Sequence, residues 1–177
     1  SLYVYSVSGS FYRASKQIAE ILIKEFANNY NFKYHFYRYG SLYGKRAQDW
    51  NGINKFISQI LKKNLIVYSG TGQEIREYVN VTDASKMTVD NSLKNIKKNG
   101  AYIISGTQQY TVDQLFNILF EIAGKKKKIK YLKKISDDHY GLTPFRFIPE
   151  KSEKIILNKF TDLGEGLLEV FHKNFKK

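Results

Sequence analysis

The chain of 177 residues has no cysteine and only two prolines. The lack of cysteine excludes a disulfide-stapled scaffold, a thiolate metal site and a cysteine nucleophile. No apolar run approaches the roughly 20 residues needed to cross a bilayer, and no signal-peptide pattern opens the chain. Hydrophobic residues still make up 42% of the chain, enough for a sizeable core. We therefore expect a folded protein with a cytoplasmic location and no membrane partner.

Acidic residues are scarce compared with basic ones: 16 Asp and Glu face 29 Lys and Arg, for a net charge of +13. Residues 124–134 (GKKKKIKYLKK) hold seven lysines and no acid, and removing them from +13 leaves +6 for the rest. A lysine run after an apolar helix is typical of a solvated edge or loop. The aromatic residues are not interleaved with arginine as in RNA-binding proteins. We therefore expect no nucleic-acid partner.

Histidine is also rare, and His35, His139 and His172 are scattered along the chain. They show none of the spacings by which side chains share a metal ion. The sequence therefore predicts no metal site.

Hydrophobic periodicity predicts strands that alternate with helices. Thr82 is a candidate N-cap for one helix, Thr111 and Gln114 match a capping box for the next, and Gly124 is expected to end that helix. The alternation predicts the α/β class with a mainly parallel sheet. The predicted helices are 12–28, 53–62, 83–97, one from the capping box to 122, and 166–175; the predicted strands are 2–5, 34–39, 65–68, 78–81, 101–104 and 128–132.

The candidate chemistry lies in residues 12–16, where Tyr12 and Lys16 are four residues apart on a predicted helix. Residues at this spacing share one helix face, so the hydroxyl and the ammonium can share a site. An unperturbed tyrosine has a pKa of about 10 and is a poor base at neutral pH. A nearby cation stabilises the phenolate and makes tyrosine a usable acid or base.

Four segments, taken together and in order, resemble the extended short-chain dehydrogenase/reductase family. The resemblance is to the NAD-dependent nucleotide-sugar epimerases and dehydratases, and it runs through nearly the whole chain. Ser41 stands where this family more often has asparagine. The segments are residues 3–8 (YVYSVS), 12–20 (YRASKQIAE), 38–44 (RYGSLYG) and 70–83 (GTGQEIREYVNVTD).

The resemblance implies a role for each matching residue at the reacting centre. Tyr12 would exchange a proton with a sugar hydroxyl while hydride passes to or from NAD. Lys16 would hold the nicotinamide ribose and lower the pKa of Tyr12. Ser8 would hydrogen-bond the reacting oxygen, with Ser6 and Ser10 as alternatives.

The resemblance also implies the cofactor and substrate contacts. Tyr39, Gly40 and Ser41 would line the nicotinamide pocket, and Ser41 would also touch the substrate. Arg76 would bind the diphosphate of a nucleotide sugar, with Arg146 as a second arginine at the substrate. Arginine suits this role because its planar fork pairs with phosphate oxygens. Gly70 and Gly72 are interpreted as turn residues, because no helix follows them directly.

The implied fold is a partial Rossmann-type parallel sheet with a small C-terminal substrate-binding α/β part. Residues 1–63 would be the C-terminal part of the NAD-binding domain, including the Tyr/Lys helix. Residues 64–177 would be mainly the substrate-binding part, interleaved with the last Rossmann elements. The family's Gly-x-x-Gly-x-x-Gly loop, which seats the pyrophosphate, does not occur in these residues. We therefore expect a fragment, or a sequence that omits residues, that binds NAD weakly by itself.

The expected function is that of an NAD-dependent nucleotide-sugar epimerase or dehydratase, with a homodimer as the family's usual assembly. Gly9 and Ser10 stand where dehydratases carry an Asp-Glu pair, which favours an epimerase or a reductase. The alternative is a non-catalytic remnant, or a basic scaffold that binds a polyanion through residues 125–134.

Overall fold

The computed structural model describes residues 11–132 and 152–175. The predicted strand at 2–5 and two predicted site residues, Ser8 and Arg146, lie outside this part. The described elements are α1 (Phe11–Tyr30), β1 (His35–Tyr39), β2 (Ser41–Tyr43), α2 (Gly52–Lys63), β3 (Ile66–Ser69), β4 (Ile75–Arg76), β5 (Tyr78–Asn80), α3 (Val81–Lys94), β6 (Gly100–Ile104), β7 (Tyr110–Thr111), α4 (Val112–Ile122), β8 (Ile129–Leu132), β9 (Glu153–Ile155) and α5 (Leu163–Phe175).

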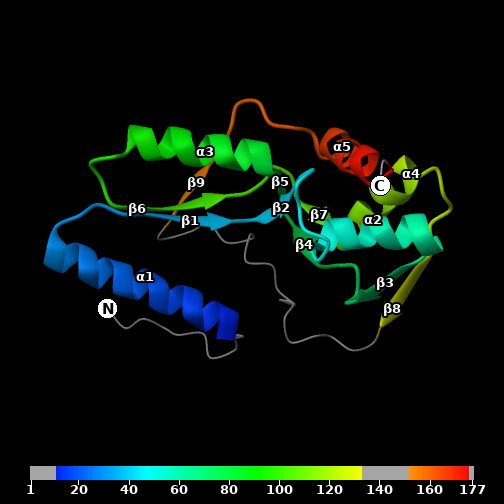
Figure 1. Ribbon diagram of the computed structural model, residues 1–177, viewed down its shortest axis with the longest axis horizontal. Helices are drawn as coiled ribbons and strands as arrows, with labels where there is room; N and C mark the ends of the chain where they lie inside the picture. The colour runs from blue at the N-terminus through cyan, green and yellow to red at the C-terminus, as the bar shows by residue number, and fades with distance from the viewer. Residues whose placement is uncertain (1–10, 133–151, 176–177) are drawn as a thin grey trace.

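A three-stranded parallel sheet, in the order β1-β6-β9, forms the first part of the molecule. Successive side chains of a strand point to opposite faces, and β1 shows this clearly. Arg38 forms an ion pair with Glu20 of α1, whereas the hydroxyl of Tyr39 lies 2.8 Å from that of Thr88 in α3. The two helices therefore cover opposite faces of this sheet (Figure 1).

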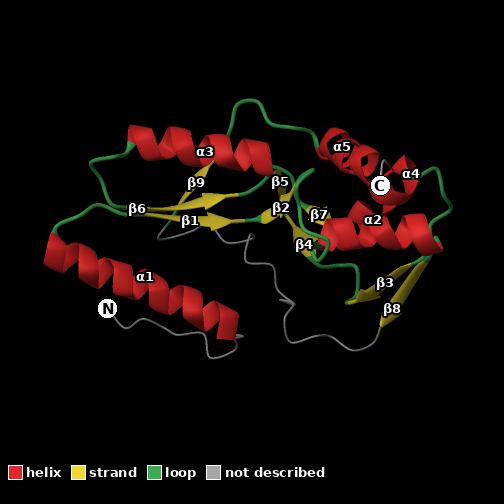
Figure 2. Ribbon diagram, in the orientation of Figure 1, coloured by secondary structure: helices red, strands yellow, loops and turns green. Residues whose placement is uncertain are grey.

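Three two-stranded pairs belong to the second part: β2 with β5 and β3 with β8, both parallel, and β4 with β7, which is antiparallel. Helices α2, α4 and α5 gather beside these pairs (Figure 2). The predicted α/β class with mainly parallel pairing is therefore confirmed.

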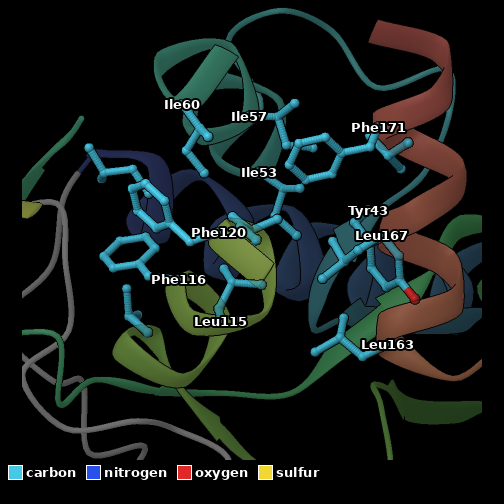
Figure 3. Close-up of a cluster of buried hydrophobic side chains, with 14 of the residues drawn as sticks. Tyr43, Ile53, Ile57, Ile60, Leu115, Phe116, Phe120, Leu163, Leu167 and Phe171 are labelled. Carbon is cyan, nitrogen blue, oxygen red and sulfur yellow. The ribbon is translucent and has the colours of Figure 1, made fainter. Parts of the chain in front are cut away.

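The main hydrophobic core lies between these three helices. Phe116, Leu119 and Phe171 are fully buried in it. Replacing a buried phenylalanine by alanine typically lowers the free energy of unfolding by about 3–5 kcal/mol, so this core contributes much of the stability of the second part. Helix α2 also packs into this core, although it belongs to residues 1–63, which the sequence analysis assigns to the NAD-binding part. Figure 3 shows the converging side chains of Ile53, Ile57 and Ile60 from α2, Leu115, Phe116 and Phe120 from α4, and Leu163, Leu167 and Phe171 from α5.

Local side-chain caps set the helix ends. The capping box of α4 is present, with Thr111 and Gln114 each bonding the other's backbone, and Gly124 follows the helix at φ +61°, as predicted. The predicted cap of α3 was wrong. Asn80, not Thr82, is the N-cap, because strand β5 ends at Asn80 and its side-chain oxygen accepts the amide of Thr82 at 2.9 Å.

Candidate active site

One edge of the first sheet holds the carboxyl ends of β1 and β6, and helices α1 and α3 begin there. Only residues 31–34 join α1 to β1, and only residues 95–99 join α3 to β6. Each helix therefore runs back along its strand and begins where that strand ends (Figure 1). Ligands of open α/β sheets bind at this edge, beyond the carboxyl ends of the strands.

Tyr12 and Lys16 lie in the first turns of α1, at this edge. The Tyr12 side chain is 71% exposed, and the ammonium of Lys16 lies 5.3 Å from the centre of its ring. The spacing of four residues thus brings the two groups together, as predicted.

The predicted nicotinamide segment, residues 39–41, links β1 to β2. The amide of Gly40 donates to the carbonyl of Ile104 at 2.8 Å, and the amide of Ser41 donates to the carbonyl of Glu77 at 3.0 Å. A side chain on Gly40 would come within 2.8 Å of the Cβ atom of Ser105, so this position has room for hydrogen only. The segment passes tightly from the first sheet to the second part.

Arg76 ends β4, two residues before β5 begins to pair with β2. Its guanidinium donates to the carbonyl of Ile75 at 2.8 Å, and its charge acts on Tyr68 and Tyr78. Burial and the charge of Glu74 raise the pKa of Tyr68 to about 12, while the charge of Arg76 opposes this rise. Within residues 11–132 and 152–175, no carboxylate forms an ion pair with Arg76. The arginine thus keeps a positive charge that an anionic ligand could use.

The backbone amides of the glycine turn before Arg76 are bonded within the chain. Gly72 has a φ of +82°, which confirms it as a turn residue. The carboxylate of Glu74 accepts the amides of Thr71 at 2.7 Å and Gly72 at 2.9 Å. Burial alone would raise the pKa of Glu74, but these hydrogen bonds outweigh it and hold the pKa below its ordinary value. The backbone donors of this turn are therefore already used by a carboxylate of the chain.

Glu77 was not predicted from the sequence as a site residue. Its side chain is only 3% exposed, and its carboxylate accepts bonds from Ser105 at 2.6 Å, Lys154 at 2.8 Å and Gln109 at 3.3 Å. A glutamate between an arginine and a tyrosine, at the junction of two short strands, has no distinctive sequence signal. Its carboxylate partners come from the end of β6, from β9 and from the residue before β7, which are far apart in the sequence.

Part of the lysine run has structural partners. Lys125 donates to the carbonyl of Ile60 at 3.0 Å near the end of α2, and Lys127 forms an ion pair with Asp113 at 2.7 Å. Cations at a helix C-terminus are favourable, because they face the unpaired carbonyls. Two of the seven lysines in this run therefore have partners within the fold and need no external ligand to explain them.

None of the helices that the structure describes is long and apolar enough to cross a membrane. The same residues contain no group of three or more histidine or acidic side chains arranged to hold a metal ion.

Residues 4–104 match the model of the NAD dependent epimerase/dehydratase family. The chain belongs to this family. The resemblance inferred from the four sequence segments is thereby confirmed, and NAD is the cofactor that gives the family its name.

Relatives of the chain are sugar-nucleotide epimerases by name. A protein of Methanocaldococcus jannaschii named "Putative UDP-glucose 4-epimerase" is 29% identical over 163 residues, which is 90% of this chain and 51% of that protein. A UDP-glucuronate 4-epimerase of Thermodesulfobacterium geofontis is 28% identical over 121 residues, 68% of this chain and 37% of its own length. The chain thus spans about half the length of the curated relatives it matches, or less.

Solved structures share the fold. The UDP-N-acetylglucosamine 4-epimerase of Methanobrevibacter ruminantium, in complex with UDP-N-acetylmuramic acid, aligns with a TM-score of 0.73 at 24% identity over 93% of this chain and 53% of that one. A likeness at this level of identity shows the fold, and it agrees with the family assignment.

Proposed function

We propose that this chain carries the catalytic helix and the substrate-binding half of an NAD-dependent nucleotide-sugar epimerase. The observation that carries the proposal is the Tyr12–Lys16 pair at the carboxyl edge of the β1-β6-β9 sheet, in a member of this family. From this edge the chain passes from β1 into β2, and β2 pairs with β5, the strand that follows Arg76.

In this proposal Tyr12 is the acid and base. It takes a proton from a ring hydroxyl of the sugar as the carbon that bears this hydroxyl is oxidised. It returns the proton after the oxidised sugar has rotated to present its other face. The chemistry that bound NAD would supply is that of a reversible hydride acceptor. Lys16 would place its positive charge beside the reacting groups, and Ser8 would donate a hydrogen bond to the reacting oxygen.

Four residues of this chain would hold the nicotinamide end of the cofactor. Lys16 would bond the ribose hydroxyls, and the backbone of Tyr39, Gly40 and Ser41 would form the wall beside the ring. The packing of Gly40 against Ser105 and Glu77 leaves no room for a side chain there, which fixes the position of this backbone wall. The adenosine end would need the glycine-rich loop that these 177 residues lack.

Arg76 would bind the diphosphate of the nucleotide sugar, with Arg146 and Ser41 as further substrate contacts. The support for Arg76 is its unused positive charge, since both neighbouring carboxylates bond other groups. A guanidinium can bind two phosphate oxygens at once.

Epimerisation is favoured over dehydration because Gly9 and Ser10 replace the Asp-Glu pair of dehydratases. The division into residues 1–63 and 64–177, a homodimer and a cytoplasmic location remain part of this proposal. A basic scaffold that binds polyanions is disfavoured, because Lys125 and Lys127 already have partners within the fold.

Calorimetric titration with UDP-glucose, UDP and glucose tests the proposal. Binding of UDP-glucose and UDP, with little binding of glucose, is the expected result, because the diphosphate supplies the charged contact. Equal binding of an unrelated polyanion such as heparin, with no preference for UDP, would support the scaffold instead.

A further inference from the structure

Glu77 joins the two parts of the molecule from a buried position. The residue before Glu77 belongs to β4, which pairs with β7, and the residue after it belongs to β5, which pairs with β2. Its carboxylate is bonded by Ser105 just after β6 and by Lys154 in β9, both in or next to the first sheet. One side chain therefore fixes the first sheet to the strand segment that carries Arg76.

The backbone of the same residue holds the proposed nicotinamide wall. The carbonyl of Glu77 accepts the amide of Ser41 at 3.0 Å, and it lies 3.0 Å from where a Cβ of Gly40 would be. Ser105, which donates to the Glu77 carboxylate at 2.6 Å, packs at the same place, with its Cβ atom 2.8 Å from that position. A shift of Glu77 would thus move this turn.

The carboxylate is also kept away from Arg76, its neighbour in the chain. The Glu77 carboxylate is paired instead with the ammonium of Lys154, at 2.8 Å. Arg76 therefore faces the tyrosines of the second part without a carboxylate partner among the described residues.

We propose that Glu77 is a positioning residue, which holds the Tyr39–Ser41 turn and Arg76 in a fixed relation so that cofactor and diphosphate are presented together. This inference rests on the proposed function. A buried ion pair needs both partners, and removing one leaves an uncompensated charge that moves its surroundings.

The test variant is Glu77→Gln, which keeps the shape and removes the charge. Simple electrostatics predicts tighter UDP binding, because a negative charge near the ligand is lost. The positioning role predicts the opposite: about tenfold weaker UDP binding by calorimetry, and no further loss when the change is made in an Arg76→Ala background. Glu20→Gln, which breaks the ion pair with Arg38 on α1, is the matched control and should leave UDP binding unchanged.

Hydrogen exchange gives a second readout that needs no ligand. In Glu77→Gln the amides of Gly40 and Ser41 should exchange about tenfold faster, while the amide of Ile66, which bonds Lys128 in the distant β3–β8 pair, should not change. Ser105→Ala, which removes one donor but no charge, should show the same pattern more weakly and serves if Glu77→Gln does not fold.

Unchanged or tighter UDP binding in Glu77→Gln, an equal further loss in the Arg76→Ala background, or exchange that rises uniformly across the chain would each overturn the inference. Failure of the unmodified chain to bind UDP would instead contradict the proposed function. In that case the local exchange at Gly40 and Ser41 still decides whether Glu77 holds the turn.

Discussion

Arg76 offers the sharpest test of the proposed substrate site. In the part of the chain that the structure describes, its guanidinium donates to the Ile75 carbonyl and forms no ion pair. A guanidinium carries five N–H groups, so one such bond leaves donors for a ligand. A hydrogen bond to a charged group contributes about 1.5–3 kcal/mol, and an anion left without its partner adds to the cost. We therefore expect Arg76→Ala to weaken binding of a UDP-sugar by roughly 2–3 kcal/mol.

At about 1.4 kcal/mol for each factor of ten, this loss corresponds to a roughly 30- to 150-fold higher Kd. Arg76→Lys should recover only part of it, because an ammonium cannot make the two parallel bonds of a guanidinium. Calorimetry with UDP-glucose measures the effect directly, and raising the salt concentration should weaken binding less in the alanine variant than in the unmodified chain.

Arg38→Ala is the matched control, because it removes a guanidinium that bonds Glu20 and Ser152 in the first part of the molecule. It should leave the Kd for UDP-glucose within about twofold, whatever it does to the melting temperature. If Arg76→Ala lowers the melting temperature but leaves the Kd unchanged, the arginine supports the fold and the diphosphate assignment is wrong.

Three further predictions concern the reaction, the cofactor and acid stability. In a protein that carries this chain behind a nucleotide-binding half with a glycine-rich loop, Tyr12→Phe should lower turnover by about 10²–10⁴-fold and leave NAD binding nearly intact; near-normal turnover would remove Tyr12 from the mechanism. The 177-residue chain alone should bind NAD weakly, and micromolar affinity by calorimetry would show that the cofactor site was assigned to the wrong residues. The pKa of Asp113 is lowered by hydrogen bonds from Lys127 and Tyr131, and that of Glu74 is lowered by backbone amides although burial opposes this. Both carboxylates therefore stabilise the fold fully above about pH 4.5, and this contribution should be lost as the pH falls through their lowered values. Urea unfolding between about pH 3 and pH 6 should show a shallower pH dependence in Glu74→Gln; an unchanged slope would exclude Glu74 as a source.

The long helices and the buried strands could be predicted from the sequence because their patterns span many residues. Helix α1 repeats apolar residues over five turns, and the capping box of α4 needs only two named side chains. Strands β2, β4, β7 and β9 were not predicted, because two or three residues are too few to show an alternation. The cap of α3 was misassigned because Asn80 and Thr82 both favour this role, and only the end of β5 decides between them.

The candidate site divides in the same way. Tyr12 and Lys16 are four residues apart in one helix, so their proximity follows from helix geometry alone. The surroundings of Gly40 do not, since they depend on Ser105 and Glu77, which approach from β6 and from the junction of β4 with β5. Contacts between residues far apart in the chain depend on the whole packing, and no local pattern reports them.

The segment Glu74-Ile75-Arg76-Glu77 shows how much this matters for function. Along the sequence, two carboxylates lie within two residues of one guanidinium. The structure gives each carboxylate another partner: Glu74 bonds the amides of its own turn, and Glu77 bonds Ser105 and Lys154. The positive charge of Arg76 thus survives beside two acids, because each acid is held by donors that the fold supplies. An anion that reaches Arg76 therefore need not displace either carboxylate, so Arg76→Ala should act on ligand affinity more than on stability.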